Sequence, residues 1–349
     1  MDTRLRFAVA MTLLLLVGLV AATGPVAAEH DAVDCSFPIT ETDATGTEMT
    51  LTEPAAEVVV LDASSAQVFW EIGAEDRVTG MPVEDFTAYL EGSETRTDVT
   101  DGQQVDVERV VELDPDLVIA PNYLDEETVE QLRETGLTVY QLGLEDSIQA
   151  IYDKTALYGH FVDECGAATE TISATQTEVE EIEAAVAGLD RPRVLYHFFG
   201  FAAGSETFIH ELLEAAGGTN LAAEAGISGY VEISDEVVVE EDPEWIVAPS
   251  HAGLPEGEPY ASTTALRSEQ TLVVDENLVS QAGPRIVVPL REMAEAFHPE
   301  AFDAPTGEPT PTDSEPSPAP DEQPGFGTSV AVTALLVAAA LGMRRRTDS

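Results

Sequence analysis

The chain has 349 residues, which is enough for two domains of ordinary size with a substantial hydrophobic core. It carries 66 acidic residues against 15 basic ones, a formal net charge of −51, and 44% of its residues are hydrophobic. The acidic residues are spread through segments with ordinary apolar patterning, so we expect a folded protein with an acidic surface. This charge argues against nucleic acid as a partner, because nothing in the chain could neutralise phosphates.

The N-terminus has the features of an export signal. Arg4 and Arg6 precede an apolar run at 7–22, and the small residues Val26-Ala27-Ala28 follow it. A charged start, an apolar run and a small-residue cleavage site are typical of a secretory signal peptide. We therefore expect residues 1–28 to be a signal peptide rather than a buried N-terminal helix.

The chain has two cysteines, Cys35 and Cys165. In an exported protein a disulfide is the default for such a pair, and it would tie the start of the mature chain to its middle. Lipidation at Cys35 and two free thiols are the alternatives, although Ala32-Val33-Asp34 is a poor lipoprotein signal. Two cysteines so far apart in sequence predict no metal site.

Residues 35–145 alternate short apolar runs with amphipathic segments. Strands that alternate with helices predict a parallel sheet covered by helices, so we expect an N-terminal α/β lobe here. The expected elements, in chain order, are a strand at 57–62, a helix at 67–73, a strand beginning at 77–79, a helix at 107–113, a strand at 117–120, a helix at 126–135 and a strand at 138–141.

Residues 146–190 have a different character. No proline occurs at 146–189, and apolar residues follow a helical period from Ile172 to Leu189, so we expect one long connecting helix, or two broken near Gly166. From 191 to 302 the alternation resumes and predicts a C-terminal α/β lobe. Its expected segments are 193–197, 208–216, 237–241, 245–248, 271–274 and 284–297. The predicted fold class is α/β, with two parallel-sheet lobes joined by a long rigid helix and a ligand cleft between the lobes.

One phrase occurs in each lobe. VVELDPDLVIAPN at 110–122 aligns with VVEEDPEWIVAPS at 238–250, and seven of the thirteen pairs are identical. A residue before proline avoids the helical region, so Asp114 and Asp242 are expected to end helices. A buried strand follows each of them. Because ligands bind outside the carboxyl ends of parallel strands, the phrase predicts one ligand-facing loop per lobe, at Asn122-Tyr123 and at Ser250-His251.

The C-terminus combines four features in order. Residues 303–323 are rich in Pro, Thr, Glu and Asp, which predicts a stiff, solvated linker. Pro324-Gly325-Phe326, an apolar run at 330–343 and Arg344-Arg345-Arg346 follow. This order resembles the PGF-CTERM sorting signal of archaeal surface proteins, and the acidic composition resembles that of salt-loving archaea. The resemblance implies that 324–349 anchors the protein outside the cell membrane, with the tail removed and a lipid attached near Pro324. An unprocessed tail would be a plain membrane anchor with the same topology.

The body of the chain, at about 47–300, resembles the substrate-binding proteins of ABC importers for cobalamin, ferric siderophores and haem. The resemblance rests on the two Asp-Pro phrases, on GSETFIHELLEAAGGTNLAAEAGISGYVEIS at 204–234 and on AGPRIVVPLREMAEAFHPE at 282–300. It implies a monomer that hands a small-molecule ligand to an ABC permease and its ATPase. It also implies that an acidic residue near the top of each lobe docks on the permease. This role falls on Glu108 and Glu236, although acids also simply stabilise helix N-termini.

The resemblance also indicates which loops face the cleft. Their aromatic and neutral polar side chains suit a broad, flat, amide-fringed ligand. Catecholate siderophores would need several arginines, and only one falls in these loops, so the set favours a near-neutral corrinoid such as cobalamin. A ferric hydroxamate siderophore is an alternative, and so is haem, with His251 or Tyr123 as axial ligand. The segment 277–280 lacks the aromatics expected of a cobalamin site. The expected ligand-binding residues are Ser64, Ser65, Phe86, Tyr89, Asn122, Tyr123, Phe199, Phe201, Tyr230, His251 and Arg285.

Two other classes of protein, enzymes and passive surface proteins, fit the sequence less well. The run from His210 to Glu214 is close to a zinc-protease helix but has Glu where the second His is required. No nucleophile elbow, P-loop or dinucleotide-binding motif occurs, so we expect no enzyme activity, no metal site and no resident cofactor. A passive surface or adhesion protein is the other class, but such proteins usually show strand-only repeats rather than an α/β pattern.

Overall fold

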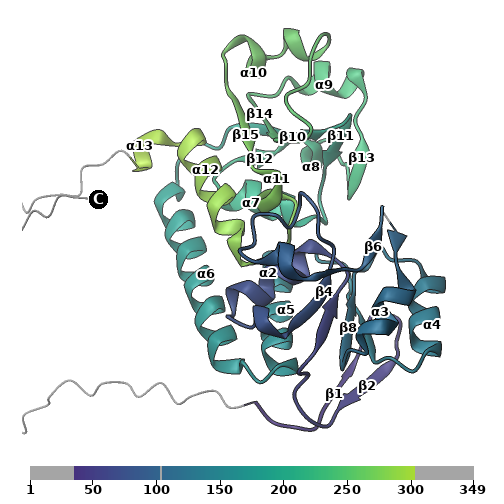
Figure 1. Cartoon of the computed structure of the whole chain (residues 1–349). Helices are drawn as coiled ribbons and strands as arrows, with labels where there is room; N and C mark the ends of the chain where they lie inside the picture. Colours follow the sequence, from purple (N-terminus) through teal and green to yellow (C-terminus); the bar gives the residue numbers. More distant parts are fainter. Residues whose placement is uncertain (1–34, 103, 303–349) are drawn as a thin grey trace, which may run out of the picture. The chain divides into compact units, whose positions relative to one another are not determined.

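The computed structural model describes residues 35–102 and 104–302, and Figure 1 shows the chain. The predicted signal peptide at 1–28, the linker at 303–323 and the tail at 324–349 lie outside these residues. Within the described ranges, no helix is both long enough and apolar enough to span a membrane.

The first sheet has five parallel strands, and helices cover both of its faces. Val58 and Val60 contribute to one core and Val59 to the other, because side chains alternate across a strand. The all-apolar central strands are fully buried, as a parallel sheet covered on both faces requires. The strand order is β5 (Thr97–Asp98), β4 (Val78–Met81), β3 (Val58–Val60), β8 (Leu117–Ala120) and β9 (Val139–Gln141), and the helices are α2 (Ala63–Glu71), α3 (Val107–Leu113) and α4 (Glu126–Glu134).

The second sheet is parallel at its centre and antiparallel at one edge, whereas the sequence predicted a purely parallel sheet. The parallel part is β12 (Thr219–Asn220), β10 (Arg193–Phe198), β14 (Trp245–Pro249) and β15 (Thr271–Val274). The carboxyl half of β10 instead pairs with β11 (Phe201–Ala203), which pairs with β13 (Tyr230–Glu232). The helices around it are α7 (Phe208–Ala215), α8 (Leu221–Glu224), α9 (Asp235–Glu241), α10 (Thr264–Arg267), α11 (Glu276–Val279), α12 (Val287–Phe297) and α13 (Pro299–Phe302).

Two helices connect the sheets. The expected helical region is broken into α5 (Ile148–Phe161) and α6 (Cys165–Val186), with Asp163 at φ 64° between them, just before the predicted break at Gly166. Helix α6 extends past both sheets (Figure 1). Its Ala168 packs in the core of the first sheet, and Val179 and Ile182 pack in the core of the second. The helix therefore fastens the two lobes, by which we mean the two sheets with their covering helices.

The remaining elements are short. Two antiparallel hairpins, β1 (Ile39–Thr42) with β2 (Glu48–Leu51) and β6 (Thr100–Asp101) with β7 (Gln104–Val105), belong to the first lobe. The predicted disulfide between Cys35 and Cys165 is confirmed, with the two Cα atoms 5.6 Å apart. It joins the segment before β1 to the first residue of α6. The short 3₁₀ turns are η1 (Glu75–Arg77), η2 (Ser93–Thr95), η3 (Tyr260–Ser262) and η4 (Pro284–Ile286).

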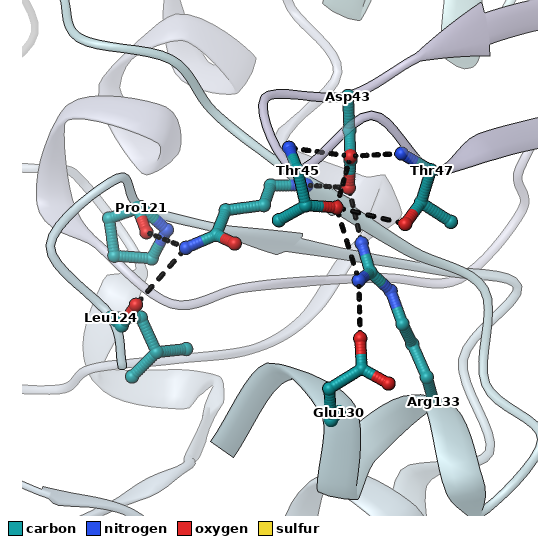
Figure 2. Close-up of polar contacts among 8 residues, drawn as sticks. Asp43, Thr45, Thr47, Pro121, Leu124, Glu130 and Arg133 are labelled. Carbon is teal, nitrogen blue, oxygen red and sulfur yellow. Dashed lines mark hydrogen bonds and ion pairs between the residues drawn. The ribbon is translucent and has the colours of Figure 1, made fainter. Parts of the chain in front are cut away.

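The first hairpin is held to its sheet by the buried carboxylate of Asp43 (Figure 2). Its oxygens accept hydrogen bonds from the backbone N–H of Thr45 at 2.9 Å, Thr47 at 3.0 Å and Gln141 at 3.1 Å, and they form an ion pair with Arg133 of α4. Burial by itself would raise the pKa of Asp43, but the hydrogen bonds and the arginine charge together lower it. The folded structure therefore favours the ionised form of the Asp43 carboxylate.

The repeated phrase has the same backbone in both lobes. Helices α3 and α9 end at Asp114 and Asp242, as predicted, and both residues adopt the left-handed conformation, with φ 48° and 40°. Aspartate tolerates this conformation better than most residues. The Asp242 carboxylate also accepts hydrogen bonds from the N–H of Thr264 at 2.6 Å and from its hydroxyl at 2.8 Å. Each phrase therefore delivers a buried strand whose carboxyl end opens into a loop.

Candidate functional site

A cavity of about 520 Å³ lies at the carboxyl ends of β10 and β14. Ligands bind at this edge in parallel α/β sheets. Six of the ten lining residues are aromatic side chains, counting His251, and none is lysine, arginine, aspartate or glutamate. The lining consists of Tyr196, Phe198, Phe201, Phe208, Ile209, Tyr230, Pro249, His251, Val279 and Ser280.

The aromatic rings of this cavity pack on one another. Phe198 stands at the centre, with its ring centroid 5.8 Å from that of Phe201, 5.7 Å from that of Tyr230 and 6.0 Å from that of Tyr196. Phe201 and Tyr230 come from the antiparallel extension β11–β13, which carries their rings to the end of β10. The extension therefore turns the end of one strand into a wall of aromatic rings.

The polar groups of the cavity are hydroxyls. Burial raises the pKa of the Tyr230 phenol to about 12, and it also raises the pKa of Tyr196, against the effect of the Ser280 hydroxyl beside it. Both phenols are therefore protonated at neutral pH and can donate one hydrogen bond each. Such a lining can stack on a flat apolar ligand and bond amides or hydroxyls, but it offers no cation to an anionic ligand.

The first lobe reaches this cavity through one aromatic contact. The ring of Phe86 contacts that of His251 edge to face, with 6.0 Å between centroids, and the ring centroid of Phe199 lies 5.2 Å from that of His251. Phe199 is 63% exposed and has φ 47°, so the turn between β10 and β11 directs its ring away from the core. The predicted residues Phe86, Phe199, Phe201, Tyr230 and His251 are thus brought together.

Arg285 and Tyr89 form a tie between the lobes, and neither residue lines the aromatic cavity. The Arg285 guanidinium lies 5.3 Å from the centroid of the Tyr89 ring and donates to Glu71 of α2 at 2.5 Å. Gln67 completes the tie, because it accepts the backbone N–H of Arg285 at 3.1 Å and donates to the Tyr89 hydroxyl at 2.8 Å. The positive charge of Arg285 is therefore already matched by a carboxylate of the protein.

Ser64 and Ser65 do not lie in a loop, contrary to our expectation. Asp62 caps helix α2 by accepting the N–H of Ser65 at 2.8 Å, so the helix starts four residues before its predicted start and includes both serines. Ser65 is fully buried, and its hydroxyl bonds Asp62 at 2.6 Å and Tyr158 at 2.8 Å. It is a structural residue and is not accessible to a ligand.

Ser64 belongs to a second buried tie, which is centred on Lys154, the one lysine of the chain. Lys154 is 4% exposed and forms an ion pair with Glu145. Its ammonium donates to the Ser64 hydroxyl at 3.1 Å in the first lobe and to the Ala282 carbonyl in the second. Burial raises the pKa of Glu145 and the lysine charge opposes this rise. The pair therefore joins both lobes behind the cavity.

The last two predicted residues, Asn122 and Tyr123, occupy the loop after β8. Both are exposed, Tyr123 to 75%, and neither lines the cavity. They stay candidates for contact with a ligand that extends from the second lobe towards the first.

A second cavity, of about 610 Å³, lies between helices α5, α6 and α7. Four glutamates line it, and no strand end opens into it. It is the larger of the two, but its position and its acidic lining do not suit the ligand expected from the sequence. We therefore assign the candidate site to the aromatic cavity.

Comparison with known proteins agrees with this architecture. The sequence profile described as "Periplasmic binding protein" matches residues 58–282, and the profile of the PGF-CTERM motif matches 323–346. The chain belongs to the periplasmic binding protein family. The motif at its end indicates anchoring at an archaeal cell surface, which is consistent with the predicted location outside the membrane.

Curated and solved members of the family are similar to this chain. The cobalamin-binding protein of Halobacterium salinarum is 40% identical over 314 residues, covering 84% of this chain and 85% of the relative. The periplasmic vitamin B12 binding protein BtuF of Vibrio cholerae has a TM-score of 0.62 at 18% identity, covering 72% and 99%. The haem-binding protein RhuT of Roseiflexus sp. RS-1 has a TM-score of 0.63 at 21% identity, covering 71% and 99%. The structural matches establish the two-lobed fold alone.

The predicted docking residues of this family member occupy equivalent positions. Glu108 lies in the first turn of α3 and Glu236 in the first turn of α9, and both are exposed. Asp106 caps the first of these helices and Ser234 the second. Neither glutamate forms an ion pair within the described residues. Both carboxylates are therefore available to a partner, and their docking role stays a prediction.

Sequence reasoning missed Tyr196, Phe198 and Ser280. Tyr196 and Phe198 lie two residues apart on β10, so they share a face of the sheet, while His197 faces the other way and packs on Tyr260 at 5.0 Å. This alternation could have indicated Phe198 as the last inward residue before the loop. No local signal indicates Ser280, because α11, only four residues long, determines its position.

Proposed function

We propose that this protein is the cell-surface substrate-binding component of an ABC importer and that its ligand is a corrinoid. The observation that carries the proposal is the aromatic cavity at the strand ends, which has hydroxyl donors and no charged lining. A corrinoid presents a flat macrocycle with an apolar surface and a rim of neutral amides. Stacking on the wall around Phe198 and hydrogen bonds from the Tyr196 and Tyr230 phenols suit both features.

The alternatives are iron chelates. A catecholate siderophore or the propionates of haem would gain from arginine or lysine beside the ligand. Arg285, the expected candidate, is paired with Glu71, and Lys154 is paired with Glu145. A near-neutral ferric hydroxamate fits the charge argument as well as a corrinoid does. The named function of the Halobacterium relative, cobalamin binding, favours the corrinoid.

Delivery follows from the two exposed glutamates and the anchored tail. We place the loaded protein outside the membrane as a monomer, docked on its permease and ATPase through Glu108 and Glu236. The macrocycle of the ligand is carried without chemical change, so we infer that the protein is not an enzyme and needs no resident cofactor or metal. The buried tie of Lys154 and the half-buried tie of Arg285 connect the lobes directly, which keeps their closure around the ligand small.

A calorimetric titration of the full chain, in detergent and multimolar KCl, distinguishes these ligands. Cyanocobalamin, a ferric hydroxamate siderophore and haemin are titrated separately. One-to-one heat with cyanocobalamin alone supports the proposal. If an iron chelate gives binding heat and cyanocobalamin gives none, the substrate is an iron chelate and the transport role still stands. If none of the three compounds gives binding heat, the proposed ligand class is refuted.

A further inference from the structure

Among the residues that line the cavity, His251 is the one whose side-chain chemistry is not accounted for by aromatic stacking. It follows the central strand β14 and lines the cavity beside Pro249. Its imidazole contacts the rings of Phe86 and Phe199, one from each lobe. Within the described ranges, neither of its ring nitrogens takes part in a hydrogen bond or an ion pair.

Three other histidines of the described chain differ in this respect, and a fourth, His197, also lacks a hydrogen bond but is buried against Tyr260 rather than lining the cavity. The Nε2 atom of His160 lies 2.9 Å from the Ser36 carbonyl, Nδ1 of His210 lies 3.3 Å from the Asn220 amide, and Nε2 of His298 lies 3.1 Å from the Gly217 carbonyl. Each of these three imidazoles therefore has a polar partner within the protein. His251 is instead positioned by apolar rings alone, so its nitrogens are free to bind a ligand in the cavity.

The free nitrogen of an imidazole is a good ligand for transition metals of borderline softness. The competing donor atoms in this cavity are poor ones. The phenols of Tyr196 and Tyr230 stay protonated because burial raises their pKa, and a neutral serine hydroxyl binds such metals weakly. No carboxylate or thiolate lines the cavity. The lining thus offers a bound metal one suitable side chain.

We propose that His251 coordinates the cobalt of the corrinoid directly, an inference that rests on the function proposed above. The cobalt(III) ion of aquocobalamin carries a water molecule on its upper face. On binding, the Co–O bond breaks and the water leaves, and the lone pair of the neutral imidazole forms a Co–N bond. Cobalt is neither oxidised nor reduced, and no proton is transferred. Cyanocobalamin holds a strongly bound cyanide in the same position and does not exchange it. The site therefore distinguishes corrinoids by the lability of their upper ligand.

The position of His251 suits this exchange. Its contact with Phe86 is an edge-to-face contact of two rings without a hydrogen bond, so no polar interaction has to be broken there when a ligand binds. The imidazole then lies against Phe199 of its own lobe, which limits the orientations of the ring. One face of the corrinoid would lie towards His251.

The test is visible absorption spectroscopy of the full chain in detergent and multimolar KCl. Aquocobalamin and cyanocobalamin are each added to the wild type, to His251→Phe, which keeps an aromatic ring in place, and to His160→Ala as a matched histidine control. Replacement of water by imidazole shifts the corrinoid bands to longer wavelength. We expect this shift for aquocobalamin with the wild type and the control, and no shift with His251→Phe. Dialysis should show that the wild type prefers aquocobalamin by about tenfold or more, and that this preference is lost in His251→Phe.

The outcomes separate the two proposals. Bound aquocobalamin with unshifted bands, or a shift that persists in His251→Phe, overturns coordination by His251 and leaves corrinoid binding standing. If neither cobalamin binds to the wild type, corrinoid binding itself is refuted and this inference with it.

Discussion

The buried pair of Lys154 and Glu145 yields the sharpest stability prediction, which concerns the variant Lys154→Met. Methionine fills a similar volume without the charge, so the variant leaves Glu145 buried without its ion-pair partner. It also removes the donor to the Ser64 hydroxyl and to the Ala282 carbonyl. Breaking a buried pair from one side costs about 3–5 kcal/mol, and we expect a loss of this size in the free energy of unfolding.

The double variant Lys154→Met, Glu145→Gln separates the ion pair from the packing. Because this double variant leaves no unpaired buried carboxylate, it should regain at least half of the free energy of unfolding that Lys154→Met loses. Asp76→Asn serves as control, because the Asp76 side chain is 99% exposed and its ion pair with Arg96 spans 3.7 Å. An exposed pair of this kind contributes less than about 1 kcal/mol.

Urea denaturation in multimolar KCl measures all three variants, because urea leaves the ionic strength unchanged. The buried pair is screened little by the salt, so its effect should persist there. An unfolding free energy for Lys154→Met within about 1 kcal/mol of the wild type would refute the reasoning, since the pair would then behave as an exposed one.

Two further predictions concern the docking glutamates and the Asp43 network. Glu108→Ala with Glu236→Ala should lower corrinoid uptake by about tenfold or more while leaving the Kd of the ligand unchanged, whereas Glu112→Ala with Glu240→Ala, one turn further along the same helices, should do neither. Normal uptake by the first pair would show that docking lies elsewhere. Asp43→Asn should lower the free energy of unfolding by about 2 kcal/mol at neutral pH. Because the folded-state pKa of Asp43 is lowered, its contribution is full above the ordinary aspartate pKa of about 4 and is lost as the pH falls through the folded-state value. The gap between variant and wild type in denaturation curves should therefore narrow below about pH 4, and a gap that stays constant or widens would contradict the assignment.

Much of the scaffold could be predicted from local patterns. Helix α3 and strand β8 have the predicted bounds, because Asp-Pro and Ala-Pro mark their ends within a few residues. The start of α2 was wrong, although Asp62 three residues before Ser65 is a capping signal visible in the sequence. The break between α5 and α6 was predicted only approximately, because the left-handed residue at the break is Asp163 rather than the glycine three residues later.

The site was harder to predict because long-range contacts decide it. Arg285 lies in a segment that the family resemblance places at the cleft, but Glu71, 214 residues away in the sequence, pairs with its guanidinium. Strand β13 is exposed along its whole length, so no apolar alternation indicates it, yet it places the Tyr230 ring against Phe198. Phe199, Phe201, Tyr230 and His251 were predicted from the cleft loops that the family resemblance indicates, and the structure places them at or beside the aromatic cavity.

The central claim is that a corrinoid binds at the aromatic cavity, and equilibrium dialysis of cyanocobalamin against two forms of the protein tests it most directly. The forms are the wild type and the double variant Phe198→Ala, Tyr230→Ala. Each ring contributes about 1.5–3 kcal/mol of apolar burial, so we predict one-to-one binding by the wild type and a Kd at least about tenfold higher for the variant. Absence of binding by the wild type, or equal affinity of the two forms, would contradict the account.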